Sequence, residues 1–247
     1  MTTLFISDLH LDASRPAMLE AFEHFIRDEA VAADALYILG DLFEAWIGDD
    51  AGDPIGERFI TAMRPLREAG TPSFFIHGNR DFLLGEDFAR RAGMTLLPDP
   101  SILDIEGTRT LLMHGDTLCT DDARYQAFRA QVHSPAWQRA FLARSVDERQ
   151  VFAAQARSES QRYTTDAGNT ALMDVNEDAV RDAMRRHGCL RLIHGHTHRP
   201  AVHRFELDEK PAERIVLGDW YEQETWLLMN QFALIYADRF TLKRPEP

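Results

Sequence analysis

Aspartate, histidine and asparagine side chains occur in five short motifs along the chain. The motifs are Asp8-Leu9-His10, Gly40-Asp41, Gly78-Asn79-Arg80-Asp81, His114-Gly115-Asp116 and Gly195-His196-Thr197-His198. Imidazole nitrogens and carboxylate oxygens are good ligands for Mn²⁺, Fe²⁺ and Zn²⁺. If the motifs converge in space, they predict a site for a pair of divalent metal ions.

Each motif taken alone is a weak signal. Asp-x-His and His-x-His are common by chance, and a Gly-Asp pair after a strand is more often a turn. Here all five motifs occur in order, and four of their acids, Asp8, Asp41, Asp81 and Asp116, would meet at one rim. Such a cluster of carboxylates is electrostatically unfavourable without cations. We therefore prefer the metal site to a set of unrelated turns.

The elements that would position these motifs are apolar runs rich in strand-forming residues. The runs cover residues 3–7, 35–39, 73–76, 110–113 and 190–193, and helical stretches separate them. This pattern predicts a buried sheet in an α/β fold. Polar residues just past such strands line one edge of the sheet, where α/β proteins place ligands.

Other elements can be assigned from local signals. Asp12 or Ser14 is expected to cap a helix with Pro16 in its first turn. The apolar face of that helix comprises Leu19, Phe22, Phe25 and Ile26. We expect further helices at 55–68 and 177–187, a hairpin of strands 102–105 and 109–113, and antiparallel strands over 201–244 with a turn at Asp238-Arg239.

Composition limits the class of protein. The 247 residues fit one compact two-sheet domain over 1–247, with a helical insertion at about 121–165. The net charge of −13 argues against nucleic acid as a partner. Two cysteines form no disulfide framework and favour a reduced cytoplasmic setting. No apolar run approaches the roughly 20 residues of a membrane span, and we expect no secretory signal.

The chemistry of two metal ions suggests an arrangement of ligands. Asp41 is assigned as the bridging ligand, because a carboxylate can present one oxygen to each ion. One ion would take Asp8, His10 and His198, and the other would take Asn79, His114 and His196. A water or hydroxide that bridges the ions at the Asp41 centre would be the nucleophile for attack on phosphorus.

The five motifs resemble those of the calcineurin-like metallophosphoesterase superfamily. That resemblance implies an α/β fold, a two-sheet α/β/β/α sandwich with a dinuclear centre at the strand ends. In the commonest pattern of the superfamily, Gly-Asn is followed by a histidine that helps to protonate the leaving group. Arg80 stands at that place here.

Longer strings around these motifs resemble a narrower family, the UDP-2,3-diacylglucosamine diphosphatases of lipid A biosynthesis. They are residues 39–46, 77–82, 113–122 and 193–200. This resemblance implies two Mn²⁺ ions, with Fe²⁺ or Zn²⁺ possible, and cleavage of UDP-2,3-diacylglucosamine to UMP and 2,3-diacylglucosamine 1-phosphate. It also implies a helical lid and a peripheral location on the cytoplasmic face of the inner membrane.

Several residues are candidates for binding this substrate. Arginine stays protonated, so Arg80 is interpreted as a phosphate clamp and charge stabiliser rather than an acid. The alternative is an ion pair with Asp81. Asp122 could contact the substrate or cap a helix. His194 could support the metal site, but a buried strand histidine is the preferred interpretation. Asn79 and His196, at the metal site, are also expected to contact the substrate.

The family binds the substrate head group with a serine, an asparagine and a lysine from the insertion. Ser160 matches the serine, and Arg157 lies where the resemblance implies an arginine. Thr164, Thr165 and Asn169 are further candidates. The segment has no lysine, and Arg162 is a possible substitute.

The charge of the insertion differs from that of the whole chain. Residues 123–164 contain seven arginines and three acids, a local charge of +4. With interleaved apolar residues, this composition favours a lid on an anionic membrane surface over a helical cap with a solvated arginine face. A general phosphoesterase acting on soluble esters or nucleotides and a metal-free scaffold of the same fold are the alternative functions.

Overall fold

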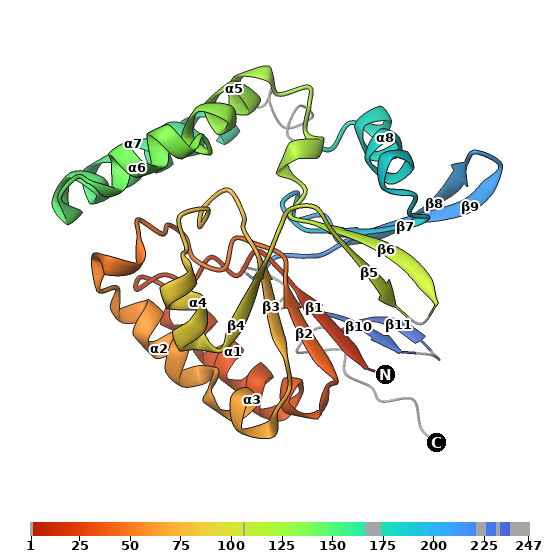
Figure 1. The fold of residues 1–247 in the computed structure, drawn as a ribbon, viewed down its shortest axis with the longest axis horizontal. Coiled ribbons are helices and arrows are strands. Elements are labelled where there is room, and N and C mark those ends of the chain that lie inside the picture. The colour runs from red at the N-terminus through yellow and green to blue at the C-terminus, as the bar shows by residue number, and fades with distance from the viewer. Residues whose placement is uncertain (1, 106, 166–173, 221–225, 231–232, 238–247) are drawn as a thin grey trace.

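The computed structural model describes residues 2–105, 107–165, 174–220, 226–230 and 233–237. Two β-sheets form its centre (Figure 1). The first comprises β1 (Thr3–Ile6), β2 (Ala35–Ile38), β3 (Ser73–Ile76), β4 (Met94–Leu97), β10 (Trp226–Asn230) and β11 (Ala233–Ala237), in the order β11-β10-β1-β2-β3-β4. The second comprises β5 (Ser101–Ile105), β6 (Thr108–Met113), β7 (Arg191–His194), β8 (Ala201–Leu207) and β9 (Lys210–Val216), in the order β5-β6-β7-β9-β8.

Helices lie on the outer faces of the two sheets and over one edge. They are α1 (Pro16–Asp28), α2 (Pro54–Ala62), α3 (Arg64–Ala69), α4 (Glu86–Ala92), α5 (Ala123–Val132), α6 (Pro135–Leu142), α7 (Val146–Thr165) and α8 (Glu177–His187). Short 3-10 turns occur at η1 (Ala30–Ala32), η2 (Asp49–Ala51) and η3 (Asp116–Leu118). Among the described residues, no helix is both long enough and apolar enough to cross a membrane.

Three apolar layers hold these elements together. Phe22 of α1 and Phe59 of α2 are fully buried against the first sheet. Phe5 and Ile193 belong to the layer between the two sheets. Met184 of α8 packs on the outer face of the second sheet. This order of helices, sheet, sheet and helix confirms the predicted α/β/β/α sandwich (Figure 1).

The direction of the strands brings the motifs to one edge. Strands β1, β2 and β3 are parallel neighbours, and so are β6 and β7. Within each sheet the chain therefore leaves these strands at one end, directly before the five motifs, and the 3.0 Å contact between Asn79 and His114 shows that the two ends meet. The predicted strand-end arrangement is confirmed, and it follows from parallel pairing in both sheets.

Three local predictions had different outcomes at the start of the chain. The face of α1 is buried as predicted, at Leu19, Phe22, Phe25 and Ile26, and Pro16 opens that helix. The predicted cap is wrong. The N-cap residue is Arg15, and Asp12 instead accepts a hydrogen bond from the backbone N of Ser14 at 2.8 Å.

Later elements also refine the predictions. The helix expected at 55–68 is two helices, because Pro65 has no N–H to continue the hydrogen-bond ladder. The hairpin of β5 and β6 and the helix α8 are confirmed. The turn expected at Asp238-Arg239 lies outside the described residues.

Helices α5, α6 and α7 lie over the edge of the sheets that carries the motifs (Figure 1). Trp137 and Phe141 stack with 4.6 Å between ring centroids, and Phe152 of α7 packs against both rings. These rings join the apolar core on which α1 and α2 also pack. The expected helices of the insertion are therefore present, and an apolar contact fixes them to the body of the protein.

His133, between α5 and α6, stacks on Phe82 of the body with 4.6 Å between ring centroids. Burial, aided by the charge of Arg129, lowers the pKa of His133 to about 4. The unfolded chain therefore binds more protons than the folded chain between about pH 6.5 and about pH 4, and this contribution to stability is lost as the pH falls.

We predict that His133→Phe, which keeps the stacked ring but cannot be protonated, removes this pH dependence. The free energy of unfolding, measured by urea titration, should fall by about 1 kcal/mol less than in the wild type over this pH range, a value reduced for partial exposure. Parallel curves for the two proteins would contradict the prediction.

Candidate metal centre

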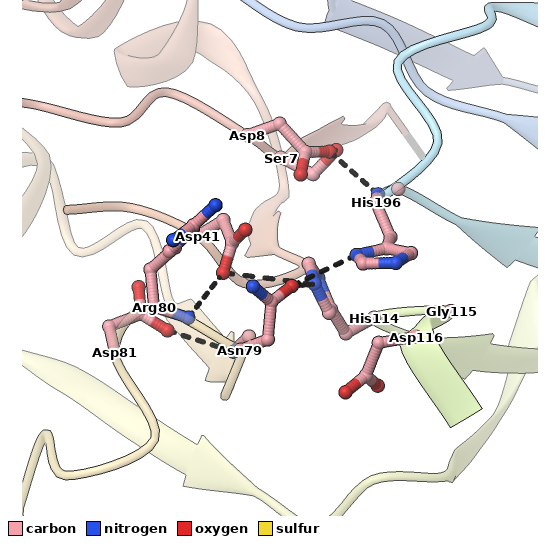
Figure 2. A network of polar contacts seen from close by, with 12 residues as sticks. Ser7, Asp8, Asp41, Asn79, Arg80, Asp81, His114, Gly115, Asp116 and His196 are labelled. Atoms are coloured by element: carbon pink, nitrogen blue, oxygen red, sulfur yellow. Dashed lines mark hydrogen bonds and ion pairs between the residues drawn. The ribbon is translucent and has the colours of Figure 1, made fainter. Parts of the chain in front are cut away.

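The motifs form two groups of side chains that face each other. The first group is Asp8, His10 and His198, and the second is Asp41, His114 and His196. Within each group the potential ligand atoms lie within 4.8 Å of one another. Figure 2 shows Asp8, Asp41, Asn79, His114 and His196 directed toward a common centre. The first group is the set that the sequence assigned to one ion, and the second joins His114 and His196 of the other set with Asp41, which the sequence assigned as the bridge.

In the first group, the potential ligand atoms lie close to one another. Nε2 of His10 lies 3.3 Å from Nε2 of His198. The same nitrogen of His198 lies 3.3 Å from Oδ1 of Asp8. Asp8 and His10 are buried, and within the described part of the chain no donor satisfies the buried Oδ1 of Asp8.

The second group is completed by Asn79. Its Oδ1 lies 3.0 Å from Nε2 of His114 and 2.9 Å from Nδ1 of His196 (Figure 2). The amide therefore directs its oxygen at two imidazoles. Asn79 was assigned with these two histidines from the sequence, and the structure brings the three together.

Asp41 lies between the two groups. Its Oδ2 is 3.8 Å from Nε2 of His10, and its Oδ1 is 3.7 Å from Nε2 of His114. Oδ1 also accepts a hydrogen bond from the backbone N of Arg80 at 2.8 Å. One carboxylate thus presents a different oxygen to each group, which is the geometry expected of a bridging ligand.

These spacings fit divalent metal ions. Two ligand atoms about 2.1 Å from one ion, and at right angles to each other, are about 3 Å apart. The pairs His10–His198, Asn79–His114 and Asn79–His196 fall at 2.9–3.3 Å. The buried Oδ1 of Asp8, which has no hydrogen bond among the described residues, also fits an ion. The residues present can therefore hold two ions of the kind that nitrogen and oxygen donors favour.

The backbone is unusual at most of these side chains. Asp8, His10, Asp41, His196 and His198 all have φ between 47° and 67°, the left-handed region. Non-glycine residues in this region cost about 1 kcal/mol or more each, and they persist where the surrounding structure determines them. The loops after β1, β2 and β7 therefore hold these residues in a backbone conformation that the sequence pattern did not indicate.

Two glycines in the motifs allow this close approach. A Cβ at Gly78 would overlap the carboxylate of Asp41, and a Cβ at Gly195 would overlap the carboxylate of Asp8. Glycine is required at both positions because a ligand side chain from another strand lies directly against the backbone.

A layer of contacts outside the candidate ligands orients them. Nδ1 of His114 contacts the carbonyl of Leu39 at 2.9 Å, and Nδ1 of His198 contacts Oδ2 of Asp219 at 3.0 Å. Such contacts fix the tautomer, so that Nε2 faces the centre. Oδ2 of Asp8 accepts hydrogen bonds from Oγ of Ser7 at 2.5 Å and from the backbone N of His196 at 2.9 Å. Ser7 and Asp219 were not predicted from the sequence, because neither belongs to a motif.

Negative charge dominates the electrostatics of the centre. Burial alone lowers the pKa of His114, but Asp41, Asp116 and Asp8 outweigh it and raise this pKa to about 9. The pKa of His198 rises to about 10 in the same way, beside Asp8 and Asp219. Burial and the charge of His114 lower the pKa of His196 to about 4. His114 and His198 thus hold protons that divalent cations would replace.

Asp81 supports the loop of Asn79 rather than pairing with Arg80. Its carboxylate accepts hydrogen bonds from the backbone N of Leu42 at 2.6 Å and of Gly78 at 2.8 Å. Burial and the charge of Asp41 raise the pKa of Asp81 to about 7. Nη2 of Arg80 instead lies 3.4 Å from Oγ of Ser160 on α7, and its buried Nε has no hydrogen-bond partner in the part of the chain that the structure describes.

Of the other residues predicted to bind substrate, Asp122 and Arg157 contact neighbouring side chains of the protein. Asp122 caps α5 by accepting from the backbone N of Tyr125 at 2.9 Å, and it also accepts from the hydroxyl of Tyr163 at 3.2 Å. Arg157 pairs with Glu44 through its Nε. The side chains of Thr164 and Thr165, and all of Asn169, lie outside the described residues.

His194 and the two cysteines lie in the interior of the protein. His194 is fully buried, with Nδ1 2.9 Å from the carbonyl of Gly195 and Nε2 3.2 Å from Nη1 of Arg214. This fits the preferred interpretation of a buried strand histidine. Cys119 and Cys189 are both buried, and they form no disulfide with each other.

A cavity of about 370 Å³ lies between the insertion and the strand-end loops. Asn79, Arg80 and His196 line it on the side of the metal centre, together with Asp122 and Ser160 of the insertion. The remaining wall is largely apolar and includes Trp46, Ile47, Phe82, Leu83, Phe128, Trp137, Phe141 and Phe152. The cavity therefore joins a polar end at the candidate metal centre to an apolar wall under α6 and α7.

Fold, centre and sequence define one class of protein. Residues 1–200 match the family model of the calcineurin-like phosphoesterases, and the chain belongs to that family. It is therefore a hydrolase with two candidate groups of metal ligands.

Named relatives narrow the comparison. The chain is 54% identical over 223 residues to the UDP-2,3-diacylglucosamine hydrolase of Escherichia coli O17:K52:H18, covering 90% of this chain and 92% of that protein. It is 53% identical, with the same coverage, to proteins of that name from Escherichia coli K12 and Shigella sonnei. The resemblance inferred from the motifs is confirmed.

We predict that the purified protein binds two divalent ions per chain, measured by elemental analysis after dialysis against Mn²⁺. Asp41→Asn should bind fewer ions, because the neutral amide has only one oxygen to share between the two groups. The exposed Asp28 provides a matched control, and Asp28→Asn should bind as the wild type does. Full metal content in Asp41→Asn would contradict a bridging role.

Proposed function

We propose that this protein hydrolyses the pyrophosphate of UDP-2,3-diacylglucosamine, releasing UMP and 2,3-diacylglucosamine 1-phosphate, with Mn²⁺ as the native metal. The observation that carries the proposal is the cavity, because its polar end adjoins the metal centre and its wall is apolar. A phosphate linkage and a pair of acyl chains require these two environments side by side. The relatives whose match covers 90% of this chain are named for the same substrate.

The seven candidate ligands have the role of holding two ions. They are Asp8, His10 and His198 for one ion, Asn79, His114 and His196 for the other, and Asp41 between them. Ions bound there supply Lewis-acid stabilisation of phosphate oxygens and an activated water. Asn79 contributes an oxygen without adding charge to a site that already contains several carboxylates.

Arg80 is proposed to clamp the phosphates. Its backbone N is held on Asp41, and its side chain extends along the cavity to Ser160. A guanidinium presents parallel N–H donors to phosphate oxygens and stays protonated, so Arg80 stabilises developing charge and transfers no proton. The buried Nε, which has no partner among the residues described, is a donor that a phosphate oxygen can satisfy.

The head group of the substrate would lie between the centre and α7. Asn79, His196, Asp122 and Ser160 line this end of the cavity. Arg157 also lines it, although its Nε pairs with Glu44. We retain Thr164 and Thr165 as proposed contacts on α7, by position in the sequence alone.

The insertion is proposed to act as a lid at the cytoplasmic face of the inner membrane. Phe128, Leu142 and Val151 are large apolar side chains exposed on its helices. Exposed apolar residues among basic ones favour an anionic lipid surface. Arg129, Arg149 and Arg157 pair with carboxylates, so the arginines available to lipid are fewer than the local charge implies.

The reaction can be tested directly. Incubation with UDP-2,3-diacylglucosamine and Mn²⁺ should release UMP, detected by chromatography. Chelation of the metal should abolish the release, and Arg80→Ala should lower kcat/KM by about a hundredfold, as expected for loss of a charge-stabilising donor. Turnover of soluble phosphate esters with none of the lipid nucleotide would contradict the proposal and favour a general phosphoesterase. Absence of any turnover with metal bound would favour a scaffold.

A variant of the cavity wall tests the site of the acyl chains. Ala156 lines the cavity, whereas Ala154 is exposed on the same helix. Ala156→Phe should lower kcat/KM for the diacylated substrate at least about tenfold, because the ring fills space that the chains need. Ala154→Phe should leave it unchanged. An equal loss toward a soluble aryl phosphate ester would show general damage instead of exclusion of acyl chains.

A further inference from the structure

Glu44 lies outside the seven candidate ligands and still contacts one of them. Its Oε2 is 3.3 Å from Nδ1 of His10, while Nε2 of His10 faces His198 and Asp41. The backbone N of Glu44 donates to the carbonyl of Leu11 at 3.1 Å, which fixes it beside the ligand loop. A carboxylate on the outer nitrogen of a ligating histidine fixes both the tautomer and the orientation of the ring.

The same carboxylate receives a side chain from α7. Nε of Arg157 forms an ion pair with Oε1 of Glu44. Nη2 of Arg15 lies 3.4 Å from Oε2 and donates to the carbonyl of His10 at 2.8 Å. The Glu44 side chain is only 15% exposed, so solvent and salt screen these contacts weakly. Glu44 therefore joins the insertion to the loop that carries His10.

Arg149 makes a second contact between α7 and the body. Its Nη1 and Nη2 bond the carboxylate of Asp50 at 2.7 and 2.6 Å, and Nη1 also bonds the carbonyl of Ile47 at 2.6 Å. Among the described residues, Asp50 pairs with Arg149 and with none of the candidate ligands. This contact holds the same helix without reaching the metal centre, and it provides the control for Glu44.

We propose that Glu44 is a positioning residue that couples metal binding at Asp8, His10 and His198 to the docking of α7. When Oε2 of Glu44 accepts a hydrogen bond from the Nδ1–H of His10, the lone pair of Nε2 is left free to bind an ion. Arg157 holds the carboxylate in that place. Because coupling between two binding events is reciprocal, an ion at His10 stabilises docked α7, and docked α7 strengthens binding of the ion. The proposal rests on the proposed metal site and not on the identity of the substrate.

Titration with Mn²⁺ alone, followed by calorimetry, tests the first half of the coupling. Glu44→Ala should weaken binding of one ion by about tenfold to a hundredfold, the usual effect of removing such a partner of a ligand. Arg157→Gln should weaken it less, because Glu44 still contacts His10. Glu44→Gln, which keeps an oxygen for His10 but loses the charge, should fall between wild type and Glu44→Ala. Asp50→Asn should weaken binding less than either Glu44 variant does, because it loosens α7 but leaves the contact of Glu44 with His10 in place.

Hydrogen exchange in α7, with and without Mn²⁺, tests the second half. In the wild type, Mn²⁺ should slow exchange of the α7 amides. This effect should be lost in Glu44→Ala and Arg157→Gln. Asp50→Asn should exchange faster overall and keep its response to Mn²⁺.

Three results would overturn the coupling. They are wild-type affinity and wild-type protection in Glu44→Ala, an equal loss of affinity in Asp50→Asn, and no binding of Mn²⁺ to the wild type. The last would overturn the proposed metal centre as well. Normal Mn²⁺ binding without hydrolysis of UDP-2,3-diacylglucosamine would overturn the proposed function alone and leave the coupling supported.

Discussion

The carboxylate of Asp41 shares its two oxygens between histidines that come from different sheets. Its neighbours at 3.7–3.8 Å are His10, which follows β1, and His114, which follows β6. These two strands belong to separate sheets, so the distance across the carboxylate depends on how the sheets pack face to face. The apolar layer that contains Phe5 and Ile193 thus fixes the geometry of a polar centre.

The insertion serves the centre in two ways. Its aromatic side chains continue the apolar core outward and form the wall of the cavity. Its arginines reach inward, where Arg129 meets Asp116, Arg149 meets Asp50 and Arg157 meets Glu44. Part of the excess positive charge of the insertion is therefore neutralised by acids of the body of the protein. Each pair has one partner that is largely buried, namely Asp116, Arg149 or Glu44, and loss of its counter-ion would leave that charge in a low-dielectric site.

The sequence predicted most of the fold and the two groups of ligands. Apolar runs followed by Asp, Asn or His were sufficient, because parallel strands place such residues at one edge. It did not predict Ser7, Asp219 or Glu44 as supports, since each acts through a contact that the chain spacing does not encode. The ion pairs of Arg129, Arg149 and Arg157 with the body were also not predicted. Counting charged residues gives the net charge of a segment but not the partner of each charge.

The left-handed backbone limits which residue types can occupy five positions of the centre, Asp8, His10, Asp41, His196 and His198. Apart from glycine, Asp, Asn and His are the residue types that adopt this conformation most readily. The same three types supply hard oxygen and borderline nitrogen donors. Exchange among them alters the donor while the loop stays as it is, whereas branched side chains are excluded on steric grounds. On this scaffold, preference for one ion over another can therefore drift through single substitutions drawn from three amino acids.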